Sequence, residues 1–84
     1  MVEFDPGKDA ANLAKHGLSL ARAPELMVEV YVEDDRLDYG ERRFRAYGLL
    51  DGKAHCLALT FRDGVVRAIS LRRAHSKEYR RHVR

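Results

Sequence analysis

The sequence predicts an α+β fold in which two N-terminal helices pack on a mainly antiparallel sheet, with a third helix at the C-terminus. Three strand-like segments, residues 42–50, 53–62 and 65–73, are separated by Asp51-Gly52 and Asp63-Gly64. An Asp-Gly pair between such segments is a strong signal for a two-residue type I′ hairpin turn. Helix signals lie only before and after these segments, so we expect helices and sheet to be segregated along the chain.

The first helix is expected at residues 6–16, after a short strand at residues 2–4. Asp5 can accept backbone hydrogen bonds as the N-cap, and Pro6 suits the first helical position. Gly17 can adopt the left-handed conformation that ends a helix. The apolar residues of this helix should face the core; they are Ala10, Leu13 and Ala14.

A second helix is expected at residues 20–27 with Ser19 as its N-cap, although Pro24 conflicts with a regular helix there. Alternating residues at 28–33, rich in β-branched side chains, predict a strand. Ser76 is expected to cap the C-terminal helix, which should run to about residue 83.

Two-residue turns fix the strand register, so the side chains that share each face of the sheet can be predicted. One face should pack on the N-terminal helices, with the rows Phe44-Leu59-Ala68 and Ala46-Leu57-Ser70. The opposite face should hold the rows Arg43-Thr60-Arg67, Arg45-Ala58-Ile69 and Tyr47-Cys56-Leu71. On that face Arg43, Arg45 and Arg67 would form a cationic patch that binds phosphate. The prediction depends on an unbroken register.

Basic and acidic residues are unevenly distributed. Residues 1–40 hold four Lys or Arg and nine Asp or Glu, whereas residues 41–84 hold twelve and four. A basic block on a small domain indicates a polyanionic ligand, and a solvated basic face is the alternative interpretation.

Length and composition narrow the class of protein. We expect residues 1–84 to form a single domain, because 84 residues support only one modest core. Apolar runs are too short to span a membrane, and the single cysteine, Cys56, fits a reducing compartment. We therefore expect a cytoplasmic protein without membrane contact. The four histidines lack metal-ligand spacing, so no metal or other cofactor is expected.

Two clusters of polar residues are candidates for a site. In the first helix, Lys8, Asn12, Lys15 and His16 lie three or four residues apart and can share one side. They could contact RNA, or Asn12 could be a capping or core-edge group beside solvent-facing lysines. At the last strand and helix the candidates are Ser70, Arg72, Glu78, Tyr79, Arg80 and Arg81. Tyr79 could stack on a base, or it could anchor the helix on the sheet.

These residues resemble the BrnT family of bacterial type II toxins. The resemblance lies in Phe4-Asp5-Pro6-Gly7-Lys8, Asn12, Lys15-His16-Gly17, Glu41-Arg42-Arg43-Phe44, Gly48, Arg67 to Ala74, Glu78 and Tyr79. It implies a RelE-like fold, ribonuclease activity on RNA and a BrnA-like antitoxin partner. Such an antitoxin has a ribbon-helix-helix domain that binds operator DNA, so the hetero-oligomer represses its own operon.

For a metal-independent ribonuclease we assign roles as a hypothesis, to residues that match the family and to two further arginines, Arg45 and Arg80. Arg43, Arg67 and Arg72 are expected to stabilise the transition state, and His16 to transfer a proton, with Lys15 and Glu41 as alternatives. The expected RNA-binding residues are Lys8, Asn12, Arg45, Ser70, Tyr79 and Arg80. The alternative function is a catalytically inactive protein that binds RNA or forms a complex with the antitoxin.

Overall fold

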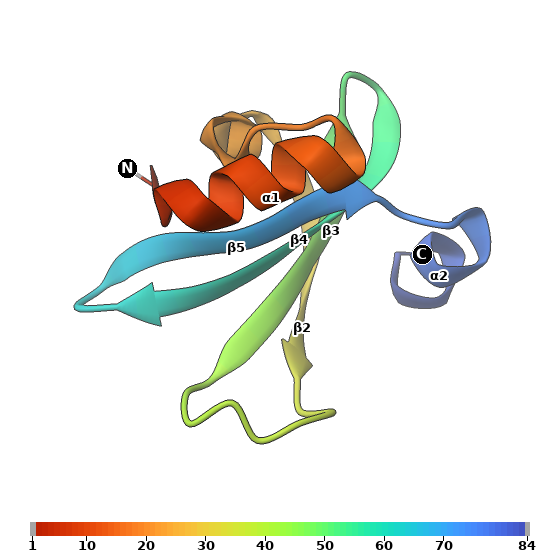
Figure 1. Cartoon of the computed structure of the whole chain (residues 1–84). Coiled ribbons are helices and arrows are strands. Elements are labelled where there is room, and N and C mark those ends of the chain that lie inside the picture. Colours follow the sequence, from red (N-terminus) through yellow and green to blue (C-terminus); the bar gives the residue numbers. More distant parts are fainter. Residues whose placement is uncertain (1, 84) are drawn as a thin grey trace.

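The computed structural model of the chain describes residues 2–83. The elements follow in the order β1 (Val2–Glu3), α1 (Pro6–His16), η1 (Leu20–Glu25), β2 (Met27–Asp34), β3 (Arg43–Leu50), β4 (Lys53–Arg62), β5 (Val65–Arg73) and α2 (Ser76–His82). The strands form one five-stranded sheet in the order β1-β5-β4-β3-β2. Among the strands of residues 2–83, only β1 and β5 form a parallel pair. The α+β class is therefore confirmed (Figure 1).

The two hairpin turns have the predicted conformation. Asp51 and Gly52 have φ values of 53° and 73°, and Asp63 and Gly64 have 52° and 77°. Positive φ at both central residues is the mark of a type I′ turn, whose twist matches that of the flanking strands. The β3–β4 register then follows the prediction along its whole length, from Leu50↔Lys53 to Arg43↔Thr60.

The second N-terminal α-helix is a wrong prediction, because η1 is a 3₁₀ helix. Ser19 caps it by accepting a hydrogen bond from the Ala21 N–H, as expected. Pro24 lies inside it and has no N–H to donate to a carbonyl four residues earlier. The backbone instead makes short-range bonds, such as Leu26 N–H to Ala23 O. The C-terminal helix is present, but His75 is its N-cap and Ser76 its first residue, with no side-chain cap.

Helix α1 contacts the sheet in an unexpected way. Its caps are as predicted: Asp5 accepts from the N–H groups of the first turn, and Gly17 has φ 71°. The prediction that the apolar residues of this helix face the core is wrong, since Ala10 and Ala14 are exposed and Leu13 is 46% exposed. The buried residue of α1 is Asn12, so this helix is attached to the sheet through a polar side chain.

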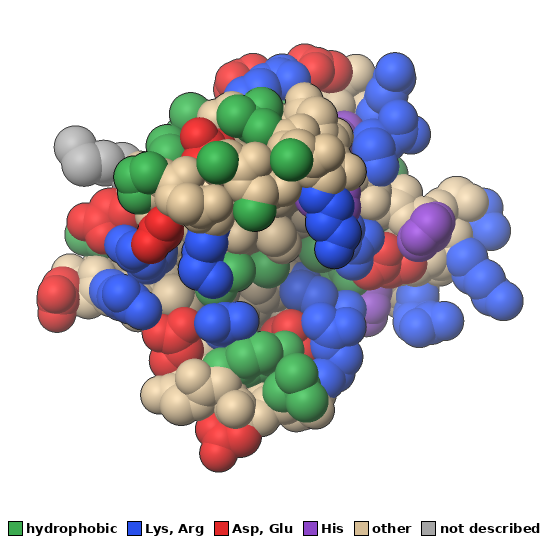
Figure 2. Space-filling view, in the orientation of Figure 1, with side chains coloured by type: hydrophobic (Ala, Val, Ile, Leu, Met, Phe, Trp, Pro, Cys, Tyr) green, Lys and Arg blue, Asp and Glu red, His purple; other side chains and the backbone are tan. Residues whose placement is uncertain are grey.

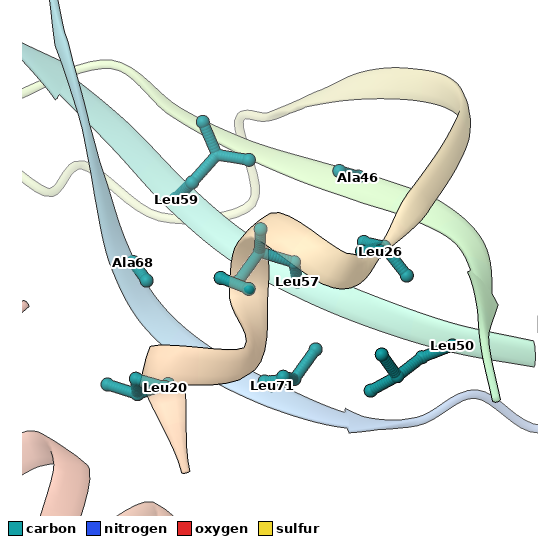
Figure 3. Close-up of a cluster of buried hydrophobic side chains, with 9 residues drawn as sticks. Leu20, Leu26, Ala46, Leu50, Leu57, Leu59, Ala68 and Leu71 are labelled. Carbon is teal, nitrogen blue, oxygen red and sulfur yellow. The ribbon is translucent and has the colours of Figure 1, made fainter. Parts of the chain in front are cut away.

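The main core lies between η1 and one face of the sheet (Figure 3). Leu20 and Ala23 of η1, and Leu26 at its C-cap, are buried against strand residues. The strands contribute Ala46, Leu50, Leu57, Leu59, Ala68 and Leu71. A 3₁₀ segment of six residues therefore performs the core-covering role expected of a longer helix.

A β-bulge interrupts the β4–β5 register at Ile69. The pairs Thr60↔Arg67 and Leu59↔Ala68 are as predicted, but the next pair is Ala58↔Ser70. Every later residue of β5 is thereby shifted by one, which exchanges its two faces. The predicted rows ending in Ile69, Ser70 and Leu71 are therefore wrong.

The shift changes what reaches each face. Leu71 is fully buried in the main core, whereas Arg72 pairs with Cys56 on the opposite face. That face has a smaller apolar cluster of Tyr47, Cys56 and Ala74, against which Tyr79 of α2 packs. None of the helices within residues 2–83 is long and apolar enough to cross a membrane.

Candidate nucleic-acid site

Arginines extend along the sheet face opposite α1. Arg43, Thr60 and Arg67 form one cross-strand row there, as the register predicts. Both arginines have acidic partners, however. Arg43 Nε lies 3.2 Å from a Glu41 carboxylate oxygen, and Arg67 lies 3.6 Å from that of Glu3. This end of the face is therefore largely charge-compensated.

The larger excess of positive charge lies at the other end of the same face. A cleft of about 940 Å³ opens where α1 ends, β5 ends and α2 begins. Its lining residues are Lys15, His16, Arg36, Arg45, Arg72, Arg73, His75, Glu78, Arg81 and His82. Six of these ten are Lys or Arg and one is acidic. Arg36 and Arg72 are paired with Asp34 and Glu78, so the positive charge that attracts anions comes mainly from the other four. Figure 2 shows Lys and Arg side chains gathered around α2 and the nearby end of α1.

A smaller hollow of about 300 Å³ adjoins the cleft between α1 and β5. The two share Lys15, His16 and Arg72. The smaller one adds Lys8, Ala11, Asn12, Ile69 and Ser70. Together, the cleft and the hollow form a continuous basic surface, which we call the cationic cleft.

A chain of hydrogen bonds joins two arginines of the cleft. The Arg45 guanidinium donates to the Tyr47 hydroxyl at 3.0 Å, and that hydroxyl donates to Glu78 at 2.7 Å. The two terminal nitrogens of Arg72 donate to the two oxygens of the same carboxylate, at 3.0 and 2.9 Å. These bonds, from Arg72 first, lower the pKa of Glu78 to about 2 despite its burial. Burial in turn raises the pKa of Tyr47.

His16 lies at the C-terminal end of α1, on the wall shared by the cleft and the hollow. Its pKa is lowered, first by burial and then by the charges of Lys15 and Arg72. A neutral imidazole can accept a proton, which is the property that a general base requires.

The structure brings some of the predicted site residues together and separates others. Six of them line the cleft: Lys15, His16, Arg45, Arg72, Glu78 and Arg81. Three more, Lys8, Asn12 and Ser70, line the adjoining hollow. Five do not line either: Glu41, Arg43, Arg67, Tyr79 and Arg80. The Tyr79 ring packs edge-on to that of Tyr47, with centroids 6.5 Å apart, and its hydroxyl is buried.

Several lining residues were not singled out from the sequence. They are Arg36, Arg73, His75 and His82. Arg36 comes from the long connection after β2 and gave no periodic signal. Arg73 ends β5, His75 precedes α2 and His82 ends it. The sequence indicates a basic cluster in this region but not the direction in which its side chains point. Within residues 2–83, no group of three or more His, Cys, Asp or Glu side chains is arranged to hold a metal ion.

The sequence profile described as "Ribonuclease toxin, BrnT, of type II toxin-antitoxin system" matches residues 4–78. This stretch runs from before α1 into the first turn of α2. The chain belongs to the BrnT family. No curated protein matches it. Membership identifies a ribonuclease toxin at the level of the family, which implies RNA as substrate and an antitoxin as partner.

Within this BrnT-family chain, most of the cationic cleft lies inside the matched stretch. Lys15, His16, Arg45, Arg72 and Glu78 all fall within residues 4–78. Two further lining residues, Arg81 and His82, lie beyond it. The two arginines that are joined through Tyr47 and Glu78 thus lie within the matched stretch, whereas the outer part of the α2 wall does not.

Proposed function

We propose that this chain is a metal-independent endoribonuclease whose catalytic centre is the cationic cleft. The supporting observation is that His16, with a lowered pKa, lies beside Arg72 on a wall where basic residues outnumber acidic ones. Such a site combines a proton acceptor with cations that stabilise a phosphate transition state.

In this mechanism the RNA supplies its own nucleophile. The 2′-hydroxyl attacks the adjacent phosphorus while neutral His16 accepts its proton. Arg45 and Arg72 stabilise the dianionic transition state through charge-assisted hydrogen bonds. The P–O5′ bond breaks, and Lys15 donates a proton to the leaving oxygen. The products are a 2′,3′-cyclic phosphate and a 5′-hydroxyl end.

The other predicted residues have supporting roles in this proposal. Lys8 and Ser70 contact RNA from the adjoining hollow, and Arg43 and Arg67 contact the flanking backbone along the sheet. Arg80 and Tyr79 extend and support the α2 wall. Glu41 forms ion pairs with Arg43 and Arg62 rather than transferring a proton, and Asn12 holds α1 in position.

We also propose that the antitoxin is BrnA-like, with a ribbon-helix-helix domain that binds operator DNA. The supporting observation is the family membership. The complex would then repress its own operon, and this chain would contact DNA only through its partner. Co-expression with such an antitoxin should yield a stable hetero-oligomer that shifts operator DNA, whereas this chain alone should not.

The cleavage proposal is tested by incubating the purified chain with RNA, with and without EDTA, and mapping the new ends. We expect EDTA-resistant cleavage that leaves cyclic phosphates. His16→Ala and Arg45→Ala should reduce cleavage by at least about a hundredfold and tenfold, respectively. Arg22→Ala is the control, because Arg22 pairs with Glu25 and Asp51 outside the cleft.

RNA binding without cleavage by the unmodified chain would favour the alternative function of an inactive RNA-binding protein. Cleavage that EDTA abolishes would contradict metal independence. Full activity in His16→Ala would remove His16 from the mechanism.

A further inference from the structure

We propose that Tyr47 and Glu78 are positioning residues that hold Arg45 and Arg72 so that both meet the same RNA phosphate. This inference rests on the proposed function, because it concerns the cleft in which we place RNA cleavage. Neither residue needs to touch RNA; each would act through the arginine to which it is hydrogen-bonded.

The strand register explains how one tyrosine can connect these arginines. Tyr47, Cys56 and Arg72 form one cross-strand row. Tyr47 and Arg72 are thus two strands apart, roughly 10 Å between backbones. The small side chain of Cys56 lies between them, and Glu78 reaches into this space from α2 to contact both. Arg45 precedes Tyr47 by two residues on β3 and therefore points to the same face.

Glu78 leaves one binding edge of Arg72 free. The carboxylate accepts from Nη1 and Nη2, which form the end of the guanidinium. Among residues 2–83, no acceptor is hydrogen-bonded to Nε. The Nε–Nη2 edge can therefore bind a phosphate in a bidentate manner while Glu78 holds the other side. The side chain is 30% exposed, and its unpartnered Nε is not fully buried, so this edge reaches the surface.

Arg45 is held in a comparable way. Its Nη1 donates to the Tyr47 hydroxyl, while its Nε is buried without a partner. Among residues 2–83, no acceptor is hydrogen-bonded to its Nη2, so that nitrogen can still reach an anion in the cleft. Tyr47 is fully buried and its hydroxyl is fixed by two hydrogen bonds. A rigid hydroxyl of this kind restricts the Arg45 rotamer and reduces the entropy lost when RNA binds.

The competing interpretation is purely structural: Tyr47 and Glu78 could simply dock α2. The helix has seven residues, and His82 stacks on the Tyr47 ring with centroids 4.8 Å apart. Tyr47→Phe distinguishes the two roles, because it keeps this ring contact and removes only the hydroxyl.

The experiment is a double-mutant cycle of Tyr47→Phe and Arg45→Ala. It measures kcat/KM for RNA cleavage, and also Kd for a 2′-O-methyl oligoribonucleotide, which lacks the nucleophilic hydroxyl. We expect Tyr47→Phe alone to lower kcat/KM about tenfold, the effect of one hydrogen bond to a charged group. In the Arg45→Ala background the same change should have little further effect. Glu78→Gln in an Arg72→Ala background should behave in the same way.

Tyr31→Phe is the matched control, because Tyr31 is 58% exposed on β2 and lines neither the cleft nor the hollow. The proposal would be overturned if the double mutants lost activity by the product of the losses of their two single variants. It would also be overturned if Tyr47→Phe left both kcat/KM and Kd unchanged. If the unmodified chain binds RNA but does not cleave it, the cleavage proposal fails. The double-mutant cycle measured through Kd then still tests whether Tyr47 and Glu78 position the two arginines. If it neither binds nor cleaves RNA, both proposals fail.

Discussion

The side chain of Asn12 is hydrogen-bonded to both backbone groups of Leu71. The Leu71 N–H donates to Oδ1 at 3.0 Å, and Nδ2 donates to the Leu71 carbonyl at 2.9 Å. Strand β1 pairs with β5 only at Val66 and Arg67, so it does not reach Leu71. Asn12 therefore acts as a one-residue continuation of that edge. Asn12 Nδ2 also donates a hydrogen bond to the Leu18 carbonyl, at 2.8 Å, and this bond fixes the turn after α1.

We expect Asn12→Ala to lower the free energy of unfolding by about 3 kcal/mol, because it leaves buried backbone groups without partners. Urea denaturation measures this loss. Lys8→Ala on the same helix is the control, since Lys8 is exposed and a surface change costs about 0.5 kcal/mol or less. Equal stability of the two variants would show that water replaces the amide at no cost.

A second stability prediction concerns Gly48. A Cβ atom at this position of β3 would collide with the backbone of Met27 and lie 2.8 Å from Val28 Cα. We expect Gly48→Ala to destabilise the fold by about 3 kcal/mol, because backbone atoms of β2 must move. Gly52→Ala is the comparison, because no atom lies within 4 Å of a Cβ at that position and only the positive φ opposes the change. We expect that variant to lose about 1 kcal/mol of stability. Thermal melts that rank Gly52→Ala as the worse variant would contradict this account.

The sequence predicted those parts of the fold that depend on local rules. The Asp-Gly turns define their own conformation, so β3, β4 and the first part of β5 could be placed in register. The bulge at Ile69 has no local signature, because a β-branched residue suits a regular strand equally well. A core-edge position for Asn12 was one of the two interpretations of the sequence, and its burial agrees with it. Its hydrogen bonds to Leu71 could not be foreseen, because they depend on β1 being too short to cover that part of β5.

The sequence predicted which residue types form the candidate site better than it predicted where they lie on the fold. The arginine row with Arg43 and Arg67 was found from register alone, but its acidic partners, Glu41 and Glu3, could be seen only in the structure. An unbroken β4–β5 register would pair Arg72 with His55, on the face opposite Arg45. The bulge moves it to the same face as Arg45, and this shift creates the cationic cleft.

The lowered pKa of Glu78 predicts how stability depends on pH. Its folded-state pKa is about 2, against an ordinary value of 4.5. The Glu78 contribution is therefore fully present above about pH 4.5 and is lost as the pH falls toward 2. Glu78 is only 20% exposed, so we expect a contribution on the order of 3 kcal/mol. Glu78→Gln should be less stable at pH 7, and its stability should converge with that of the unmodified chain near pH 2. A constant difference across this range would contradict the assignment.

The titration of His16 should respond to Lys15. Burial is the first cause of its lowered pKa, and the charge of Lys15 is the second. Lys15→Gln should therefore raise the pKa of His16 but leave it below the ordinary value of 6.5. Histidine NMR signals followed over pH measure this directly, with Lys53→Gln on β4 as the control. A pKa of His16 that is unchanged in Lys15→Gln would mean that solvent screens the two groups from each other.

The salt dependence of RNA binding can distinguish direct phosphate contacts from a general attraction. Each phosphate contact that a cation makes to single-stranded RNA releases counterions and adds about 0.7 to the slope of log K against log salt. Arg45 and Arg81 both line the cleft, so Arg45→Ala and Arg81→Ala should each reduce that slope by about 0.7. Arg22→Ala removes the same charge from an exposed ion-pair cluster outside the cleft, and its slope should match that of the unmodified chain. Equal slopes for all three variants would mean that only the total charge matters and that the cleft does not bind the RNA backbone.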